Sequence, residues 1–233
     1  MSCTVEIKNL DLIISGNKIL KNINLQASHG DFITILGKNG AGKTSVLKVI
    51  MGIYKANGIV KICDEVLEKN NLFFLRKKIA YLPQNFLVDK YFPILVKDIL
   101  QLPLNENLSK SQKAKEIIEE FGISNLLKNP FGLLSGGEKQ KVMLAMTLLK
   151  EPIILLLDEP NLNLDYFAYK NFLNLVEKIY YSKKLTILFI THLVNHIPDA
   201  SKKVIVMKNG EIIFSGSKSE IFNKKNFLEF IYD

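Results

Sequence analysis

The sequence lacks several residue types that mark specialised classes of protein. It contains no tryptophan and two cysteines, and only one of its 31 basic residues is an arginine. Two cysteines are too few for a disulfide framework or for a zinc site with four cysteine ligands. We therefore interpret Cys3 and Cys63 as reduced residues that serve in packing.

Long apolar stretches are also missing. The two longest, Ile153–Leu157 and Leu185–Ile190, have the length of strands, whereas a membrane helix needs about 20 apolar residues. The N-terminus lacks the basic and apolar regions of a signal peptide, so we expect a cytoplasmic chain. With 233 residues, of which 48% are hydrophobic and 23% charged, the composition is typical of a globular protein with a proper core.

The chain carries a basic excess, with a net charge of +8. Its lysines are scattered and gather only in short clusters such as Lys77-Lys78 and Lys224-Lys225. They do not form a stripe that alternates with aromatic residues, as a nucleic-acid platform would. We interpret the excess as a solvated surface and expect no nucleic-acid partner.

The hydrophobic pattern predicts strands and helices in an ordered succession. Near-continuous apolar strands separated by helices indicate an α/β fold with a mostly parallel sheet that is covered on both faces, and the helices between about 84 and 150 are typical of an insert. The predicted strands are Thr4–Leu10, Ile19–Leu25, Phe32–Leu36, Gly58–Cys63, Lys78–Leu82, Ile153–Leu157, Leu185–Ile190, and Lys203–Met207 and Glu211–Phe214 around the turn Asn209-Gly210. The predicted helices are Lys43–Met51, Lys110–Phe121 with Ser109 or Ser111 as its cap and Gly122 as its end, Gly136–Leu149, and Asp165–Tyr181.

A glycine-rich loop of the form G-x-x-x-x-G-K-[ST] joins a predicted strand to a predicted helix. In this pattern the loop amides and the helix N-terminus hold phosphates. The Lys43 ammonium reaches the β- and γ-phosphates, and the Thr44 hydroxyl binds Mg²⁺. The predicted nucleotide-binding residues are Gly37, Lys38, Asn39, Gly40, Ala41, Gly42, Lys43, Thr44 and Ser45.

Two carboxylates follow the apolar strand Ile153–Leu157. Ligand sites in open α/β sheets lie at the carboxyl ends of strands. Asp158 is thus placed to hold Mg²⁺, and Glu159 to orient or deprotonate an attacking water. The alternative is an acidic turn without a catalytic role.

A second candidate anion site lies at Leu134–Gln140. Ser135 is placed to cap a helix, and Gly136-Gly137 exposes backbone amides at the N-terminus of that helix. Without the other motifs, an ordinary capped helix would explain the segment equally well.

Taken together, these motifs resemble the ATP-binding-cassette ATPases, whose signature reads L-S-G-G-x-x-Q. The resemblance covers essentially the whole chain. It implies a P-loop NTPase fold with a mostly parallel core sheet, an N-terminal antiparallel β-subdomain and a helical insert. It further implies a single domain over 1–233, with a core at about 1–84 and 151–233 and a helical subdomain at about 85–150. The motifs follow the family order: the phosphate loop, Gln84 in Tyr81-Leu82-Pro83-Gln84, the signature, Asp158-Glu159, and Thr191-His192.

The resemblance also implies roles for individual residues. Such domains act as head-to-tail homodimers that enclose two ATP molecules with Mg²⁺. Ser135, Gly136 and Gly137 would bind the γ-phosphate of the ATP held by the partner copy, and Asp165 would act across the dimer. Gln84 would contact Mg²⁺ and the water, and would relay movement to a membrane partner. His192 would touch the γ-phosphate.

Three positions depart from the family pattern. Ile14 stands where an aromatic residue usually stacks on adenine, and Leu193 stands where an aspartate usually follows the histidine. The loop after Pro160 begins with Asn161-Leu162 in place of small polar residues. These departures concern nucleotide affinity and local geometry, because every catalytic group is present.

The type of cassette follows from what surrounds the motifs. Long heptad arms are absent and each motif occurs once, which argues against coiled-coil DNA-repair relatives and two-cassette translation factors. The chain is expected to work with a separate permease, on the inner face of the cell membrane.

The segment 88–100 resembles a stretch of the subunits that serve zinc, manganese and iron importers, so we expect permease docking near 84–104. Phe86, Tyr91 and Phe92 would contribute to it, unless they simply pack the helical insert.

The sequence therefore predicts an ATPase subunit that drives import of a divalent metal ion or metal complex. Metal specificity would reside in the permease and in a binding protein, so no site for the transported metal is expected in this chain. The alternatives are a cassette for another solute or a lipid, and an assembly or regulatory ATPase without a permease. A scaffold that does not hydrolyse ATP is disfavoured by Glu159 and His192.

Overall fold

The computed structural model describes residues 5–84, 91–160 and 164–223. Its strands are β1 (Val5–Ile14), β2 (Asn17–Ala27), β3 (Phe32–Leu36), β4 (Asn57–Ile62), β5 (Glu65–Val66), β6 (Ile79–Leu82), β7 (Ile154–Asp158), β8 (Thr186–Thr191), β9 (Lys203–Lys208) and β10 (Glu211–Ser217). Its α-helices are α1 (Lys43–Ile50), α2 (Leu72–Lys77), α3 (Val96–Gln101), α4 (Gln112–Glu120), α5 (Gly136–Leu148), α6 (Tyr166–Lys183) and α7 (Lys218–Phe222), with short 3-10 helices at Ser124–Leu126, Phe131–Leu133 and Val194–His196.

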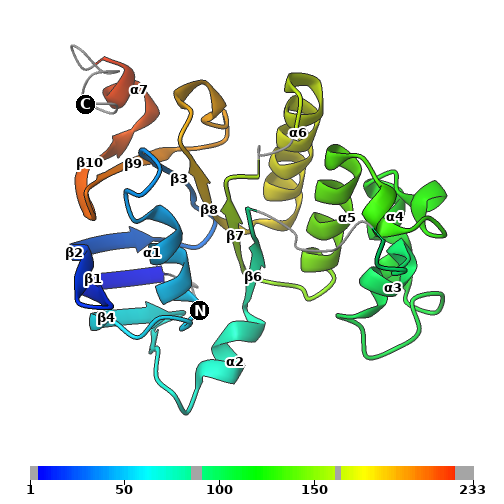
Figure 1. Ribbon diagram of the computed structural model, residues 1–233, viewed down its shortest axis with the longest axis horizontal. Coiled ribbons are helices and arrows are strands. Elements are labelled where there is room, and N and C mark those ends of the chain that lie inside the picture. The colour runs from blue at the N-terminus through cyan, green and yellow to red at the C-terminus, as the bar shows by residue number, and fades with distance from the viewer. Residues whose placement is uncertain (1–4, 85–90, 161–163, 224–233) are drawn as a thin grey trace.

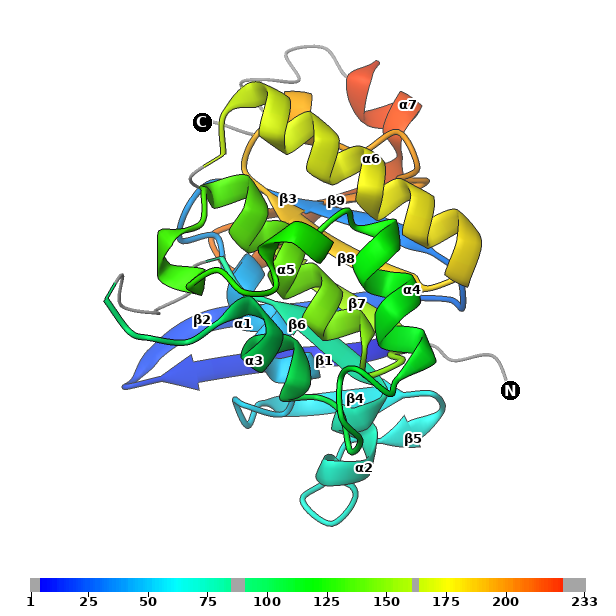
Figure 2. The same cartoon turned by 90° about the vertical axis from the view of Figure 1, so that its right-hand side faces the viewer.

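A six-stranded sheet in the order β10-β9-β3-β8-β7-β6 forms the centre of the molecule, and only β10 runs antiparallel to its neighbour. Every residue of β3, β7 and β8 is buried, because α5 and α6 pack on one face and α1 with the second sheet on the other (Figures 1 and 2). This two-sided burial explains the continuous apolar runs. The predicted α/β fold with a mostly parallel core sheet is confirmed.

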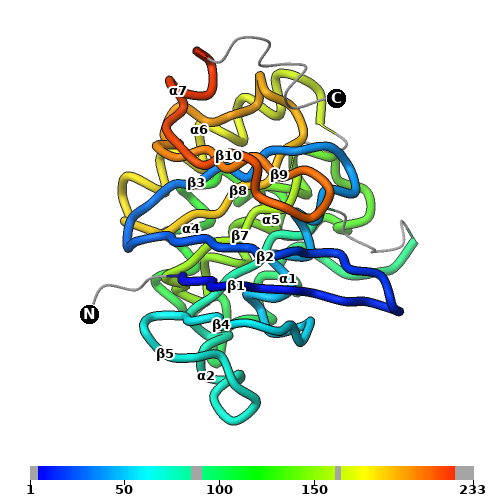
Figure 3. The backbone as a smooth tube through the Cα atoms, turned by 90° about the vertical axis from the view of Figure 1, so that its left-hand side faces the viewer, coloured from blue at the N-terminus to red at the C-terminus, as the bar shows by residue number. Residues whose placement is uncertain are grey.

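The second sheet is antiparallel, in the order β2-β1-β4-β5, and it confirms the expected antiparallel unit (Figure 3). The expectation that Cys63 is reduced is wrong, because Cys63 is disulfide-bonded. In this sheet Val5 pairs with Ile62, so the start of β1 lies beside the end of β4, and the sequence gives no sign of this long-range pairing. Cys3 lies outside the described residues.

The four predicted helices are confirmed as α1, α4, α5 and α6, and of the two cap candidates for α4 the structure uses Ser111. The Ser111 hydroxyl accepts a hydrogen bond from the Ala114 amide at the start of α4, and Gly122 follows that helix with a φ of 61°. The predicted β9–β10 turn is confirmed as well, with left-handed backbone at Asn209 and Gly210. The short helices α2, α3 and α7 are not predicted from the sequence. The division into a core and a helical subdomain at 85–150 stays a prediction.

In the described parts of the chain, no helix is both long enough and apolar enough to cross a membrane.

Candidate functional site

The predicted site residues outside the signature segment lie at one edge of the central sheet. The phosphate loop follows β3, Gln84 follows β6, Asp158 ends β7, and Thr191 ends β8. Since these strands are parallel neighbours, their carboxyl ends lie side by side. This edge is where open α/β sheets bind ligands.

The phosphate loop requires glycine at two close approaches. A side chain at Gly37 would collide with the backbone oxygen of Met207, and one at Gly42 would lie 2.7 Å from Leu20. Gly42 caps α1 with a left-handed φ of 98°, its first turn contains no acidic residue, and within the described parts of the chain no side chain caps its first amides. The N-terminal amides and the dipole of α1 therefore suit an anionic ligand.

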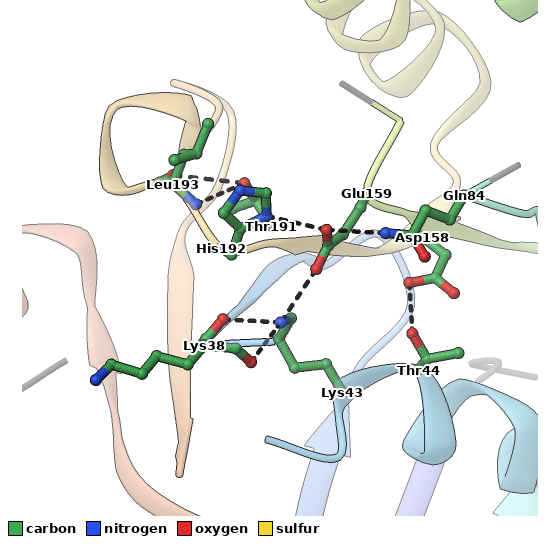
Figure 4. Close-up of polar contacts among 10 residues, drawn as sticks. Lys38, Lys43, Thr44, Gln84, Asp158, Glu159, Thr191, His192 and Leu193 are labelled. Carbon is green, nitrogen blue, oxygen red and sulfur yellow. Dashed lines mark hydrogen bonds and ion pairs between the residues drawn. The ribbon is translucent and has the colours of Figure 1, made fainter. Parts of the chain in front are cut away.

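Lys43 is 4% exposed, and its ammonium group bridges the loop and the end of β7. It donates to the backbone oxygens of Gly37 at 2.7 Å and Lys38 at 2.9 Å. It also forms an ion pair with Glu159, with 3.1 Å between Nζ and Oε1 (Figure 4). A buried ammonium is thus held by groups that phosphate oxygens could replace.

The Glu159 carboxylate contacts three other predicted site residues. Its Oε2 lies 2.9 Å from Nδ1 of His192 and accepts a hydrogen bond of 3.2 Å from Gln84. Its backbone has a φ of 44°, in the left-handed region that is rare for residues other than glycine. Strained backbone of this kind is commonly found at functional sites. The structure therefore brings Glu159, Lys43, His192 and Gln84 together.

Asp158 is held at both carboxylate oxygens. The Thr44 hydroxyl donates to Oδ1 at 2.9 Å, and the Tyr81 hydroxyl donates to Oδ2 at 2.9 Å. Burial raises the pKa of the Asp158 carboxyl above its usual range, and the hydrogen bonds from Tyr81 and Thr44 oppose that rise. A hydroxyl and a carboxylate in contact form the hard oxygen set that Mg²⁺ prefers.

Tyr81 is a site residue that the sequence analysis missed. It lies on β6 in register with Leu156 of β7, two residues before Asp158. Burial and the charge of Asp158 raise the pKa of its hydroxyl, which therefore stays a donor. The sequence places Tyr81 three residues before Gln84, but it does not show that this strand lies beside the Asp158 strand.

The signature segment forms a capping box at the start of α5. The Ser135 hydroxyl accepts from the Glu138 amide, and the Ser135 amide donates to the Glu138 carboxylate at 2.9 Å. The predicted cap is confirmed. Among the residues that the structure describes, no hydrogen bond joins Ser135, Gly136 or Gly137 to the phosphate loop. One copy of the chain thus does not bring the two predicted anion sites together.

The remaining positions that the sequence singles out make local structural contacts. Asp165 caps α6 by accepting from the Ala168 amide at 2.8 Å. Ile14 ends β1, partly buried against the core between the two sheets. The Leu193 amide donates to the Thr191 hydroxyl at 3.1 Å. Asn161 and Leu162 lie outside the described residues.

Comparisons with known proteins agree with this geometry. Residues 20–162 match the family model described as "ABC transporter". The zinc import ATP-binding protein ZnuC of Wolbachia pipientis wMel is 38% identical over 226 residues, which cover 97% of this chain and 87% of that protein. The manganese transport system ATP-binding protein MntB of Halalkalibacterium halodurans is 30% identical and covers 95% of this chain and 89% of its own length.

Similar solved structures include the two that follow. The structure of cbiO1 from Clostridium perfringens, part of the ABC transporter complex cbiONQ, superposes with a TM-score of 0.84 at 27% identity, covering 97% of this chain and 93% of that one. A bacterial Atm1-family ABC exporter with ATP bound gives a TM-score of 0.84 at 22% identity, over 98% of this chain and 41% of that one. At that identity the second likeness shows the fold alone.

Proposed function

The chain belongs to the ABC transporter family, and from that premise we propose that it is the ATP-hydrolysing subunit of an importer for a divalent metal ion or metal complex. The observation that carries the metal assignment is the 38% identity to a zinc import subunit over 97% of this chain. The manganese transport relative supports the same class of cargo. The cargo would pass through a separate permease.

The donor set at the sheet edge fits ATP and Mg²⁺. Lys43, the loop amides and the α1 N-terminus would hold the phosphates, while Thr44, Asp158 and Gln84 would hold Mg²⁺. The metal supplies neutralising charge for the transferred phosphoryl group. Lys43 would exchange Glu159 for phosphate oxygens. Glu159 is then free to orient or deprotonate the attacking water, with His192 and Gln84 beside it.

The site is proposed to be completed by a second copy of the chain. Gly136 and Gly137 carry the first backbone amides of α5, and no described hydrogen bond joins Ser135, Gly136 or Gly137 to their own phosphate loop. In a head-to-tail homodimer they would bind the γ-phosphate held by the partner, and Asp165 would lie at the same contact. The dimer would lie peripherally on the inner face of the cell membrane.

Permease docking is proposed through the segment 84–104. Tyr91 is 86% exposed and Phe92 is 56% exposed, which supports docking over the packing of the helical insert for these two residues. Phe86 lies outside the described residues.

Tyr91→Asp is expected to reduce zinc and manganese uptake to background while the isolated subunit keeps its basal ATPase rate, because a charge in an apolar contact costs several kcal/mol. Uptake of both metals by cells carrying the variant, together with recovery of a membrane protein on the purified subunit, tests the proposal. Tyr181→Asp is the matched control, since Tyr181 is 68% exposed on α6. Normal uptake by the Tyr91 variant would contradict docking at this segment, and failure of wild-type chains to restore uptake of either metal would contradict the function.

Tyr81→Phe is expected to move the loss of divalent-metal binding to higher pH, because a hydrogen bond to a charged group favours the charged form of Asp158. The Tyr81 hydrogen bond lowers the pKa of Asp158, so its removal raises that pKa further. A carboxyl with a higher pKa gains its proton earlier as pH falls, and the neutral form no longer attracts the cation. Electron paramagnetic resonance of bound Mn²⁺ with ATP, from neutral to acidic pH, measures the midpoint.

The matched control is Tyr180→Phe, which removes a tyrosine hydrogen bond to the Gly30 carbonyl oxygen, away from Asp158. Equal midpoints for the wild type and the Tyr81 variant would exclude Tyr81 as a positioning residue for Asp158.

Ile14→Tyr is expected to tighten ATP binding about fivefold, because base stacking on an aromatic ring is worth roughly 1–3 kcal/mol and Ile14 retains part of it. The first aromatic residue of the chain, Phe32, is buried in the core and packs against Tyr180, so it is not available to the base. The wild type should therefore bind GTP within about tenfold of ATP.

Titration with ATP, GTP and inorganic triphosphate measures these affinities. Ile13→Tyr is the control, since neighbouring residues of β1 point to opposite faces and Ile13 is the more exposed. A strong ATP preference in the wild type would mean that other residues hold the base.

A further inference from the structure

The six-residue helix α2 exposes two adjacent phenylalanines. Phe73 is 76% exposed and Phe74 is 56% exposed. Ile53, which follows α1, is 52% exposed beside the residues that anchor this helix. Large apolar side chains that cluster on a surface mark a contact site. We name the exposed Phe73 and Phe74 with the flanking cations Lys69, Arg76, Lys77 and Lys78 the α2 tip.

The helix that carries the two phenylalanines is firmly anchored. Leu75 is fully buried. Leu72 packs so closely on Gly52 that a side chain at position 52 would collide with the Leu72 side chain. The Arg76 guanidinium donates to the backbone oxygens of Met51 at 2.8 Å and Gly52 at 3.2 Å. Exposure of the two rings is therefore a property of an ordered helix.

Cations accompany both rings. The Lys77 ammonium lies 4.6 Å from the centre of the Phe73 ring, and the Lys78 ammonium lies 4.9 Å from the centre of the Phe74 ring. Glu65 offsets part of this charge through its ion pair with Lys78 at 3.2 Å. Rings with ammonium groups beside them match the boundary between acyl chains and anionic headgroups, where apolar and charged parts are satisfied together.

The α2 tip lies at one end of the molecule. In Figures 1, 2 and 3 α2 lies at the end opposite α7. It precedes β6, whereas Gln84 and the phosphate-binding residues lie at the carboxyl ends of the strands. Contact through the tip would thus leave the nucleotide site open.

We propose that the α2 tip binds the surface of an anionic membrane, with Phe73 and Phe74 inserted at the headgroup boundary and Lys69 and Lys77 facing lipid phosphates. A protein partner is less suited, because two rings provide far less than the roughly 800 Å² per partner that a stable interface buries. This inference goes beyond the proposed function, since it gives the subunit a lipid contact of its own. The tip would act together with the permease contact, because one weak anchor binds reversibly.

The test is flotation of the full chain with vesicles of phosphatidylcholine alone and of phosphatidylcholine mixed with phosphatidylglycerol. The wild type is expected to float with the mixed vesicles and to be released by high salt. Phe73→Ser with Phe74→Ser is expected to weaken binding by at least about tenfold, and Lys77→Glu by roughly tenfold.

Two controls separate the α2 tip from general properties of the chain. Tyr181→Ser removes an aromatic ring that is 68% exposed on α6, and Lys183→Glu reverses an exposed charge on the same helix. Both are expected to bind mixed vesicles like the wild type. Their ATPase rates, and those of the tip variants, report that each protein is folded.

Three outcomes would overturn the proposal: a wild type that ignores mixed vesicles, phenylalanine variants that still float, or equal losses for Lys77→Glu and Lys183→Glu. If the phenylalanine variants float but no longer recover a membrane protein from detergent extracts, the tip is a permease contact. Because flotation reads lipid binding directly, any of these results leaves the transport function to its own test.

Discussion

Glu159→Gln protein is expected to bind ATP normally and to hydrolyse it at least about 100-fold more slowly than the wild type, since general-base assistance contributes that much or more. The amide keeps the size of the side chain but cannot take a proton from water. Lys43, the loop amides and Thr44 are unchanged, so the phosphates are still held. Phosphate release over time measures hydrolysis, and nucleotide titration measures binding.

A neutral amide at position 159 also removes the charge that pairs with Lys43 and faces His192. Glu211→Gln is the matched control, because it removes a charge that pairs with Lys21 on the surface. Turnover of the Glu159 variant at the wild-type rate would exclude Glu159 as the catalytic base. Catalysis would then not explain its contacts with Lys43, His192 and Gln84.

Chains with Lys43→Ala and chains with Ser135→Arg are expected to be inactive alone and active when mixed. In a head-to-tail dimer, one site of the heterodimer combines both altered residues and the other combines both native ones. With random pairing, about a quarter of the wild-type number of sites is intact. ATPase rates of each variant and of the equimolar mixture test this arrangement.

The control is a chain with both substitutions mixed with wild type, because each site of that heterodimer contains one altered residue. Activity of the first mixture above the separate variants, and none gained by this heterodimer, would support sites shared between copies. A mixture no more active than its components would place Ser135 outside the partner's nucleotide site.

The parts of the site that the sequence predicts are local in the chain. The phosphate loop and the Ser135 cap each depend on residues within a few positions of one another, and such patterns carry their own geometry. The convergence of Gln84, Asp158 and Thr191 follows from parallel strands that end at one edge.

The features of the site that the sequence does not predict depend on contacts between distant segments of the chain. The Tyr81–Asp158 hydrogen bond spans 77 positions and the Lys43–Glu159 ion pair needs strand order and side-chain rotamers together. The interpretation of Cys63 as reduced is wrong because two cysteines in a sequence form no pattern that distinguishes a disulfide from packing residues.

Short helices were missed for a related reason. In α2, Leu75 is the one residue that is buried, and its anchoring arginine bonds to backbone at Met51 and Gly52. Six residues give too few apolar positions for a period of 3.6 to stand out. Helix α4 is predictable because it is longer: three of its nine residues form a buried face, and a serine caps its start.

We propose that one copy of the chain binds ATP and that a second copy completes the site. The most direct measurement is the mass in solution of Glu159→Gln protein with ATP and Mg²⁺, by light scattering with and without nucleotide. The account predicts twice the chain mass of 26.5 kDa with ATP and one chain mass without it. A mass of one chain while ATP is demonstrably bound would contradict the account.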